Sequence, residues 1–278
     1  MSGQLFRLTF TKLRSFERCR KQYWFRYLSG REWPPDVPTP ALIVGKGVHR
    51  AMKTLCETGR PEDGASELDT YLRMPIHECA GPGTDGHRDA FALFERGCEA
   101  HASIESEASW PELDTWVPWE SRGLSIRARM DRADRLGPGQ WQIVDWKTGR
   151  YELDEHIDTQ LDISHLALRV SKRLAAQDNV TAIGWNLRTG ERRERRLTRA
   201  DARATMFRMH GLAERMQKTV EFEATPGPGC AFCEWRPQCA AAAAVPLAID
   251  ALEWDEFVEP ASEVEDQPAE FDDGSAMS

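Results

Sequence analysis

The chain has 278 residues, a hydrophobic content of 41% and a formal net charge of −9. It contains no run of about eighteen apolar residues and no signal-peptide pattern, which excludes a helical membrane protein and predicts a soluble, intracellular protein with a real core. In a reducing compartment its seven cysteines are expected to be ligands or core residues rather than disulfides.

The acidic charge is concentrated at the C-terminal end. Residues 250–278 hold 11 acidic residues and no lysine or arginine, which leaves 34 acidic against 36 basic residues in the rest of the chain. The body of the protein is therefore compatible with a polyanionic partner. We expect residues 1–249 to form a single domain and residues 250–278 a disordered acidic tail, either a plain appendage or a partner-binding peptide.

The first part of the chain predicts helices. Residues 11–28 predict one or two helices, and after a proline-rich loop ALIVGKGVHRAMKTLCETG predicts a helix that ends at Gly59. Two more helical patterns cover about 64–74 and 86–107, with the loop AGPGTDG between them.

The second part predicts strands with helices around them. TWVPWES, LSIRARMDRADRL and WQIVDWK predict three strands, the last two joined by a GPG turn. DEHIDTQLDISHLALRVSKRL predicts an amphipathic helix, VTAIGWNLR a strand with a short return strand after it, and residues 199–218 a last helix. This order predicts a mixed α/β fold with a largely central sheet.

Three charged residues in the predicted strands indicate chemistry. Strand alternation puts Asp145 and Lys147 on one face, and pairing through the GPG turn brings Asp131 near them. Buried carboxylates beside an ammonium are costly unless they bind a cation, and hard oxygen ligands suit Mg²⁺ or Mn²⁺. Such an ion activates water at a phosphodiester, and Lys147 then holds that water or stabilises the phosphate. The alternative is a surface ion pair on a solvated strand.

Two neighbours of this set are weaker signals. His49 lies on the predicted helix upstream and suits Mn²⁺, although a lone helical histidine is more often structural. Gln160 lies just downstream, where it can contact a DNA backbone or the water held by Lys147.

A cysteine cluster follows the last helix. Cys230, Cys233 and Cys239 have two and five residues between them in a loop rich in proline and glycine. Three thiolates do not complete a four-coordinate site, and Cys19 is the natural fourth ligand. Spacing alone leaves zinc and an iron–sulfur cluster open.

Six motifs taken together resemble a known family. LRSFERCRKQYWFRYL, GKGVHRAM, ARMDRAD, IVDWKTGR, TQL and CAFCEWRPQC occur in this order between residues 9 and 239. The set resembles the RecB-like branch of the PD-(D/E)xK nuclease superfamily, which includes the nuclease domains of RecB and AddB and the CRISPR-associated exonucleases of the Cas-four type.

The resemblance implies a fold and a domain plan. The implied fold is a restriction-endonuclease-like α/β core with a central mixed sheet flanked by helices, an N-terminal helical region and a C-terminal iron–sulfur cysteine loop. Residues 1–249 would form one RecB-like nuclease domain, with a helical insertion at about 60–110 and a catalytic core at about 112–200. A clasp would join Cys19 to residues 230–239.

The resemblance also implies residue roles. The implied metal ligands are His49, Asp131, Asp145 and the backbone carbonyl of Trp146, and the implied catalytic residues are Lys147, Asp131, Asp145 and Gln160. The implied ligands of a [4Fe–4S] cluster, with zinc as the alternative, are Cys19, Cys230, Cys233 and Cys239. Glu120 has an implied minor acidic role. Two positions depart from the pattern of the relatives. Arg20 follows Cys19 where proline is common, and Ser164 stands where a tyrosine is common, which puts substrate positioning in doubt.

The implied activity is that of an exodeoxyribonuclease that uses Mg²⁺ or Mn²⁺ on single-stranded DNA or DNA ends in recombination, repair or replication. The expected setting is the cytoplasm of a bacterium, with the protein encoded by that host or its phage. The expected partners are DNA and, through the acidic tail, a helicase or other recombination protein, but no membrane. The alternatives are a non-catalytic scaffold that binds DNA ends and a structure-specific endonuclease. Candidate contacts to DNA phosphates are Arg127, Arg129, Arg132, Arg135, Arg150 and the ERRERR run at 191–196, which is equally a solvated turn.

Overall fold

The computed structural model describes residues 5–34, 39–150, 153, 155–171, 174 and 177–245. The helices are α1 (Phe10–Arg18), α2 (Arg20–Tyr27), α3 (Pro40–Thr58), α4 (Pro61–Leu72), α5 (Asp85–Ala102), α6 (Glu155–Val170), α7 (Arg199–Lys218) and α8 (Ala240–Ala243). The strands are β1 (Phe6–Leu8), β2 (Ala108–Trp119), β3 (Leu124–Gly137), β4 (Gln140–Lys147), β5 (Asn179–Asn186) and β6 (Arg192–Arg195). Short 3-10 turns cover Pro75–Ala80, Glu120–Arg122, Pro228–Phe232 and Arg236–Gln238.

The strands form one mixed sheet in the order β1-β3-β4-β5-β6, and β2 pairs with the other edge of β3. The β1–β3 and β4–β5 pairs are parallel, and the other pairs are antiparallel. On one edge β3 pairs with β1 at 124–126 and with β4 at 132–137. Residues 127–131 lie between these two ladders, so β3 and β4 diverge next to Asp131.

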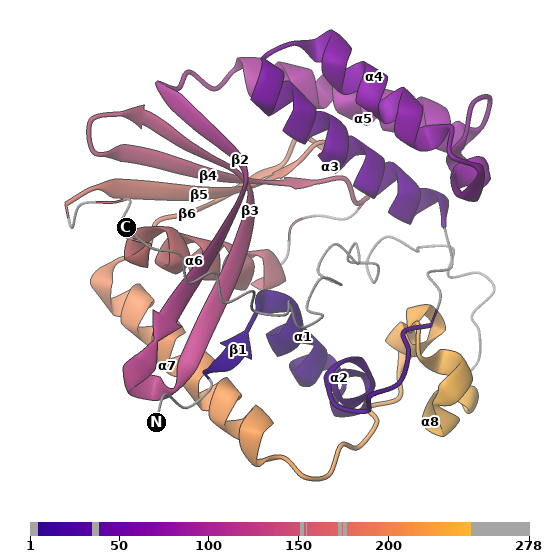
Figure 1. Cartoon of the computed structure of the whole chain (residues 1–278), viewed down its shortest axis with the longest axis vertical. Helices are drawn as coiled ribbons and strands as arrows, with labels where there is room; N and C mark the ends of the chain where they lie inside the picture. The colour runs from indigo at the N-terminus through magenta and orange to yellow at the C-terminus, as the bar shows by residue number, and fades with distance from the viewer. Residues whose placement is uncertain are drawn as a thin grey trace, which may run out of the picture.

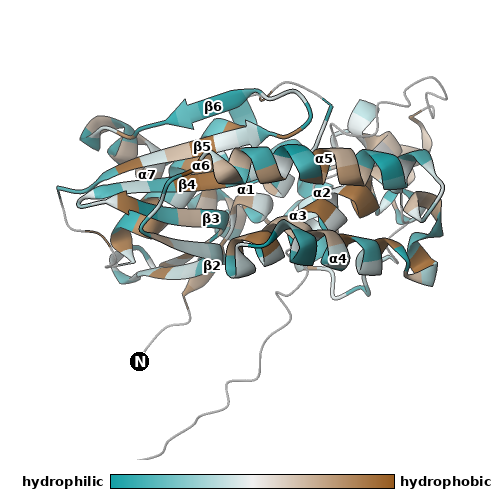
Figure 2. Cartoon of the chain, turned by 90° about the horizontal axis from the view of Figure 1, so that it is seen from above, coloured by the Kyte–Doolittle hydropathy of each residue, from teal (hydrophilic) through white to brown (hydrophobic). Residues whose placement is uncertain are grey.

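Helices cover both faces of the sheet (Figure 1). Helices α1, α6 and α7 share one apolar core with β2, β3 and β4. Helices α3, α4 and α5 share a second core with the far end of β4, through Val144 and Trp146. At the sheet edge, β6 is hydrophilic along its length (Figure 2), as expected for a strand with one side open to solvent.

Most predicted elements are confirmed, and some boundaries are corrected. The helix α3 ends at Gly59, whose φ of 70° is the left-handed conformation that glycine adopts easily. The last helix covers 199–218 as predicted and begins with a capping box at Thr198. The strand β1 was not predicted, because three residues carry no readable alternation. The strand β2 begins earlier than predicted, at Ala108, and tolerates Pro111 because it lies at a sheet edge.

The structure confirms the predicted mixed α/β fold, with a central mixed sheet flanked by helices. No helix in the described ranges is long and apolar enough to cross a membrane. The predicted acidic tail at 250–278 lies outside the described residues. The division into an insertion at about 60–110 and a catalytic core at about 112–200 stays a prediction.

Candidate active site

The end of β4 and the first turns of α6 form a polar triangle. Lys147 Nζ lies 2.8 Å from Asp145 Oδ2 and donates a hydrogen bond to Gln160 Oε1 at 3.0 Å. The Gln160 amide in turn donates to Asp145 Oδ1 at 2.8 Å. Strand alternation places Asp145 and Lys147 on the face that α6 covers, so the predicted shared face of these two residues is confirmed.

Asp131 joins the triangle to α3. Its Oδ1 lies 3.2 Å from His49 Nδ1, and its Oδ2 accepts a hydrogen bond of 2.7 Å from the backbone amide of Trp146. Because β3 and β4 diverge next to Asp131, its carboxylate occupies the fork between the strands. His49 reaches the fork from α3 on one face of the sheet, and Gln160 reaches it from α6 on the other face. The site therefore lies at a point that helices on both faces of the sheet reach.

Burial and charge act against each other in this cluster. Burial favours the neutral form of His49, but the charge of Asp131 and its hydrogen bond outweigh that effect and raise the pKa of the imidazole. For Asp131, burial is outweighed by His49, Lys147 and the amide of Trp146, so its pKa is lowered. For Asp145, burial wins against Lys147, and the nearby charge of Asp131 adds to it, so its pKa is raised. The two carboxylates therefore repel each other.

The segment that follows β4 is held by three successive residues at the end of β5. Leu187 donates its backbone amide to the Lys147 carbonyl at 2.7 Å, and Arg188 Nε donates to the Thr148 carbonyl at 3.1 Å. The Asn186 side chain donates to the Gly149 carbonyl, also at 3.1 Å. The Arg188 guanidinium is itself anchored to Asp89 of α5 by two contacts of 2.6 and 2.7 Å. No local sequence signal pointed to Arg188 or Asp89.

Glu112 on β2 and Glu120 in the turn after β2 lie at different distances along the chain from the fork. Glu120 lies exposed in the turn between β2 and β3, and its minor role stays a prediction. Glu112 instead lies next to the fork, with a φ of 44° that is unusual for a residue with a side chain. It pairs with Arg129 at 2.6 Å and with Lys53 of α3 at 3.4 Å. Its backbone conformation has no sequence signature.

The family description "PD-(D/E)XK nuclease superfamily" matches residues 7–240. The chain belongs to this nuclease superfamily. The expectation from the motifs is confirmed at this level, and nuclease chemistry is the activity of the family.

Two solved structures resemble this PD-(D/E)XK protein. One is from Eubacterium rectale and is provisionally named an exonuclease; it has 15% identity and a TM-score of 0.49, and the match covers 76% of this chain and 79% of that one. The other, named SSO0001, has 16% identity and a TM-score of 0.37, and the match covers 80% of this chain and 94% of that one. No curated protein matches the chain significantly.

Nucleases of this superfamily generally use divalent metal ions, and the donor set at the fork has the right chemistry for one. Asp145 Oδ2 is buried and contacts Lys147 Nζ, but among the described residues it has no hydrogen bond of acceptable geometry. A cation would satisfy this oxygen and relieve the repulsion between the two aspartates. In the arrangement seen, each aspartate faces a basic side chain, and no group of three or more His, Cys, Asp or Glu in the described ranges is arranged to hold a metal.

The segment that carries three of the predicted cluster cysteines contacts the two N-terminal helices, and the meeting of the four thiols stays a prediction. The backbone amide of Thr225 donates to Cys19 Sγ at 3.4 Å, and the Arg18 guanidinium donates to the Gly229 carbonyl. Arg26 on α2 pairs with Glu234, and Phe25 stacks on the fully buried Trp235 at 5.1 Å. Residues 223–239 thus pack against α1 and α2. The four predicted ligands, Cys19, Cys230, Cys233 and Cys239, are free thiols, and burial raises the pKa of Cys233 to about 12.

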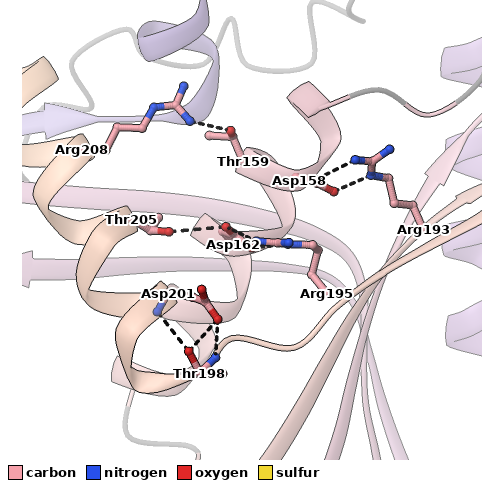
Figure 3. Close-up of polar contacts among 9 residues, drawn as sticks. All are labelled: Asp158, Thr159, Asp162, Arg193, Arg195, Thr198, Asp201, Thr205 and Arg208. Atoms are coloured by element: carbon pink, nitrogen blue, oxygen red, sulfur yellow. Dashed lines mark hydrogen bonds and ion pairs between the residues drawn. The ribbon is translucent and has the colours of Figure 1, made fainter.

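Two arginines of β6, which was predicted as a phosphate path or a solvated turn, pair with acids of α6. Arg193 holds Asp158 with contacts of 2.6 and 2.8 Å, and Arg195 holds Asp162 with contacts of 2.9 and 3.0 Å (Figure 3). Both acids lie on α6, and Thr205 of α7 also donates to Asp162. These ion pairs, each with two contacts, join the sheet edge to α6, the helix that carries Gln160.

Proposed function

We propose that this protein is a metal-dependent DNA exonuclease that hydrolyses phosphodiester bonds in single-stranded DNA or at DNA ends, in recombination, repair or replication. The observation that carries the proposal is the meeting of Asp131, Asp145 and Lys147 in one fork, with His49 and Gln160 completing it from the two helix layers. Membership in the nuclease superfamily gives this cluster its chemistry.

The proposed metal ligands are His49, Asp131, Asp145 and the backbone carbonyl of Trp146. Mg²⁺ or Mn²⁺ bound there would polarise the phosphodiester and lower the pKa of a bound water. His49 and Asp131 pair with each other in this structure. Each would instead contribute its nitrogen or oxygen atom as a ligand of the ion. Oxygen donors dominate the set, which favours a hard ion over a soft one.

The proposed role of Lys147 is to hold the attacking water or to stabilise charge that develops on the scissile phosphate. Its ammonium lies at the fork, 34% exposed, so it is reachable by substrate while its neighbour Asp145 is only 9% exposed. Gln160 positions Lys147 and Asp145 relative to each other through its amide. This arrangement fixes the direction of the ammonium before substrate arrives.

At the cysteine clasp we propose a [4Fe–4S] cluster bound by Cys19, Cys230, Cys233 and Cys239, as in the RecB-like branch that the motifs resemble, with zinc as the alternative. The support is the packing of residues 223–239, which carry three of these thiols, against α1 and α2, which flank Cys19. A metal there would join segments that are far apart in the sequence. Anaerobic purification followed by a visible spectrum and metal analysis separates the cluster from zinc.

The deciding experiment for the nuclease is cleavage of an end-labelled single strand with Mn²⁺. Asp145→Ala and Lys147→Ala are expected to lose about a thousandfold or more in rate, because each removes a group that acts on the reacting phosphate. DNA binding in both variants should remain. Lys218→Ala, which changes an exposed lysine on α7, is the matched control.

Undiminished cleavage by either variant would refute the assignment of the site. A circular single strand in the same gel distinguishes the activities: an exonuclease leaves it intact, whereas the rival structure-specific endonuclease opens it.

A further inference from the structure

The strands β2 and β3 change face at the level of Asp131. In a regular strand, residues three positions apart point to opposite faces of the sheet. In β3, however, Met130 and Ala133 both lie in the core that α1, α6 and α7 share. In β2, Leu113 lies in the same core and Trp110 packs against it. The alternation of both strands is therefore shifted by one residue at the same level.

A backbone irregularity accompanies the shift. The β2–β3 register omits Glu112 and Asp131, which lie opposite each other between the pairs on either side. Glu112 has a φ of 44°, a left-handed conformation that is unfavourable for a residue with a side chain. As a result, two neighbouring side chains of β3 point to one face of the sheet. Asp131 contacts His49 of α3. Arg132 contacts His101 of α5.

Arg132, a candidate phosphate contact from the sequence, is instead buried and has a partner for each nitrogen of its guanidinium. Its Nε donates to Asp134 Oδ1 at 2.8 Å, Nη1 to His101 Nδ1 at 2.7 Å and Nη2 to Ser109 Oγ at 3.2 Å. The Ser109 hydroxyl also donates to Asp134. The side chain of Arg132 is 3% exposed and that of Asp134 0%. We call Arg132, Asp134, His101 and Ser109 the Arg132 network.

Two neighbouring elements hold the Arg132 network. Ser109 belongs to β2, and His101 belongs to the last turn of α5. Burial and the charge of Arg132 lower the pKa of His101, so the neutral imidazole keeps the lone pair that accepts from the guanidinium. Asp134 Oδ2 has no hydrogen-bond partner among the described residues. A buried ion pair adds little net stability, which points to the position of β3 as the role of this one.

We propose that the Arg132 network positions the carboxylate of Asp131. Arg132 follows Asp131 directly, so holding its side chain toward α5 maintains the shift that turns Asp131 toward the fork. With regular alternation, the two side chains would point to opposite faces of the sheet. Arg132 is thus a positioning residue that acts through Asp131. The inference rests on the proposed nuclease function only for the use of Asp131 as a metal ligand.

Replacing the buried ion pair by apolar residues separates positioning from stability. Arg132→Met together with Asp134→Leu removes both charges at once, which proteins often tolerate without loss of stability. Thermal unfolding should therefore show a folded protein. The backbone amide of Trp146, which donates to Asp131 Oδ2 at 2.7 Å, reports the position of the carboxylate without any metal. In EDTA its hydrogen exchange, followed by NMR on isotope-labelled tryptophan, should become about tenfold faster, because the amide loses its acceptor.

Mn²⁺ binding gives a second readout, because Asp131 is a proposed ligand of the ion. Isothermal titration calorimetry without DNA should show that the double variant binds Mn²⁺ about tenfold to a hundredfold more weakly than the wild type. Losses of this size are typical when the groups that orient a metal ligand are removed.

The matched control is Arg195→Met together with Asp162→Leu. This pair also joins an arginine to an aspartate by two contacts, of 2.9 and 3.0 Å, but it links β6 to α6. It should leave the exchange of the Trp146 amide and the affinity for Mn²⁺ as in the wild type.

A milder variant keeps the test open if the double variant does not fold. His101→Leu, at a half-buried position, removes one acceptor of Arg132 and should also speed the exchange of the Trp146 amide. Wild-type exchange in the folded double variant, or in His101→Leu if the double variant is unfolded, would overturn the positioning role. An equal change in the control pair would overturn it too. If exchange rises but the wild-type protein binds no Mn²⁺, the positioning of Asp131 stands and the proposed metal site fails.

Discussion

At the scale of single residues, Gln160 joins both charged groups of β4. Its amide oxygen accepts from Lys147 and its amide nitrogen donates to Asp145, so replacing it removes one hydrogen bond from each of them. Gln160→Leu is expected to lower kcat about a hundredfold, because small displacements of reacting groups have effects of this size. Single-turnover cleavage with saturating Mn²⁺ measures it.

The control for this variant is Gln142→Leu on β4. Gln142 is also buried, but its amide nitrogen has no hydrogen-bond partner among the described residues, so leucine should be tolerated. If the two variants lose activity equally, the loss reflects general damage to the core and not the amide bridge.

His165 on α6 makes stability depend on pH. Its side chain is 2% exposed, and burial, with the charge of Arg169 adding to it, lowers its pKa from 6.5 to about 4. Between these values the unfolded chain takes up a proton that the folded protein does not, so stability is full above the unfolded pKa and falls as pH drops toward 4. We expect His165 to contribute roughly 2 kcal/mol of this loss by about pH 5.

The prediction is that His165→Leu weakens the dependence. Urea unfolding at about pH 7 and about pH 5 should show a smaller loss of stability in the variant than in the wild type. His210→Leu, at a half-buried histidine on α7, should keep the wild-type difference. An identical pH difference in the wild type and His165→Leu would show that other groups cause the acid loss.

The sequence was enough to predict which residues form the candidate site, but not all of the backbone conformations and contacts around them. Asp131, Asp145 and Lys147 were found because strand alternation and one turn bring them together, and His49 and Gln160 because their motifs resemble a family. Glu120 was chosen by its place in a motif, and the structure puts it in an exposed turn. Backbone conformation such as that of Glu112 depends on strand pairing, which single residues do not reveal.

At the scale of elements, the segment after β4 depends on the end of β5. Arg188 reaches the Thr148 carbonyl while Asp89 of α5 fixes its guanidinium, so α5, the end of β5 and the segment after β4 are joined by one side chain. Asp89 and Arg188 lie 99 residues apart in the sequence. No local pattern predicts such a pairing.

Arg188→Met is therefore expected to lower kcat about tenfold, because Thr148 loses the contact that orients the turn next to Lys147. The matched control is Arg192→Met in the same hairpin, whose guanidinium lies over Trp185 and pairs with Glu194 on the surface. Steady-state kinetics separate the two, provided that circular dichroism shows both variants folded. A tenfold loss in Arg192→Met would assign the effect to the hairpin as a whole.

The ERRERR run shows why charge alone misleads at this scale. From sequence, its arginines were candidates for DNA contacts or a solvated turn. In the structure, Arg193 and Arg195 pair with acids of α6 that lie 35 and 33 residues earlier. These pairs form only after β6 has joined the sheet next to α6. The amino-acid composition of the run therefore could not reveal them.

At the scale of the whole molecule, the order of elements was enough to predict a central mixed sheet flanked by helices, because long amphipathic helices and alternating strands dominate the chain. The strand order and the fork in β3 were not predictable, since β1 has three residues and pairs with a strand more than a hundred positions later. The position of the site depends on that fork.

The clasp gives a prediction for the whole chain. If Cys233 binds a metal centre, Cys233→Ala should yield colourless, aggregation-prone protein, because residues 223–239 lose their anchor to α1 and α2. Cys79→Ala, at an exposed cysteine, is the control and should keep the wild-type spectrum. Absorbance and size-exclusion chromatography measure both. A brown, well-folded Cys233→Ala protein would place the metal elsewhere.

The packing of residues 223–239 on α1 and α2 also bears on synthesis. Helices α1 and α2 are synthesised before residues 223–239, and the aromatic contact of Phe25 requires Trp235, which follows some two hundred residues later. During translation these early helices expose apolar side chains until the late segment arrives. The apolar surface of α1 and α2 is thus completed only after Trp235 has been made.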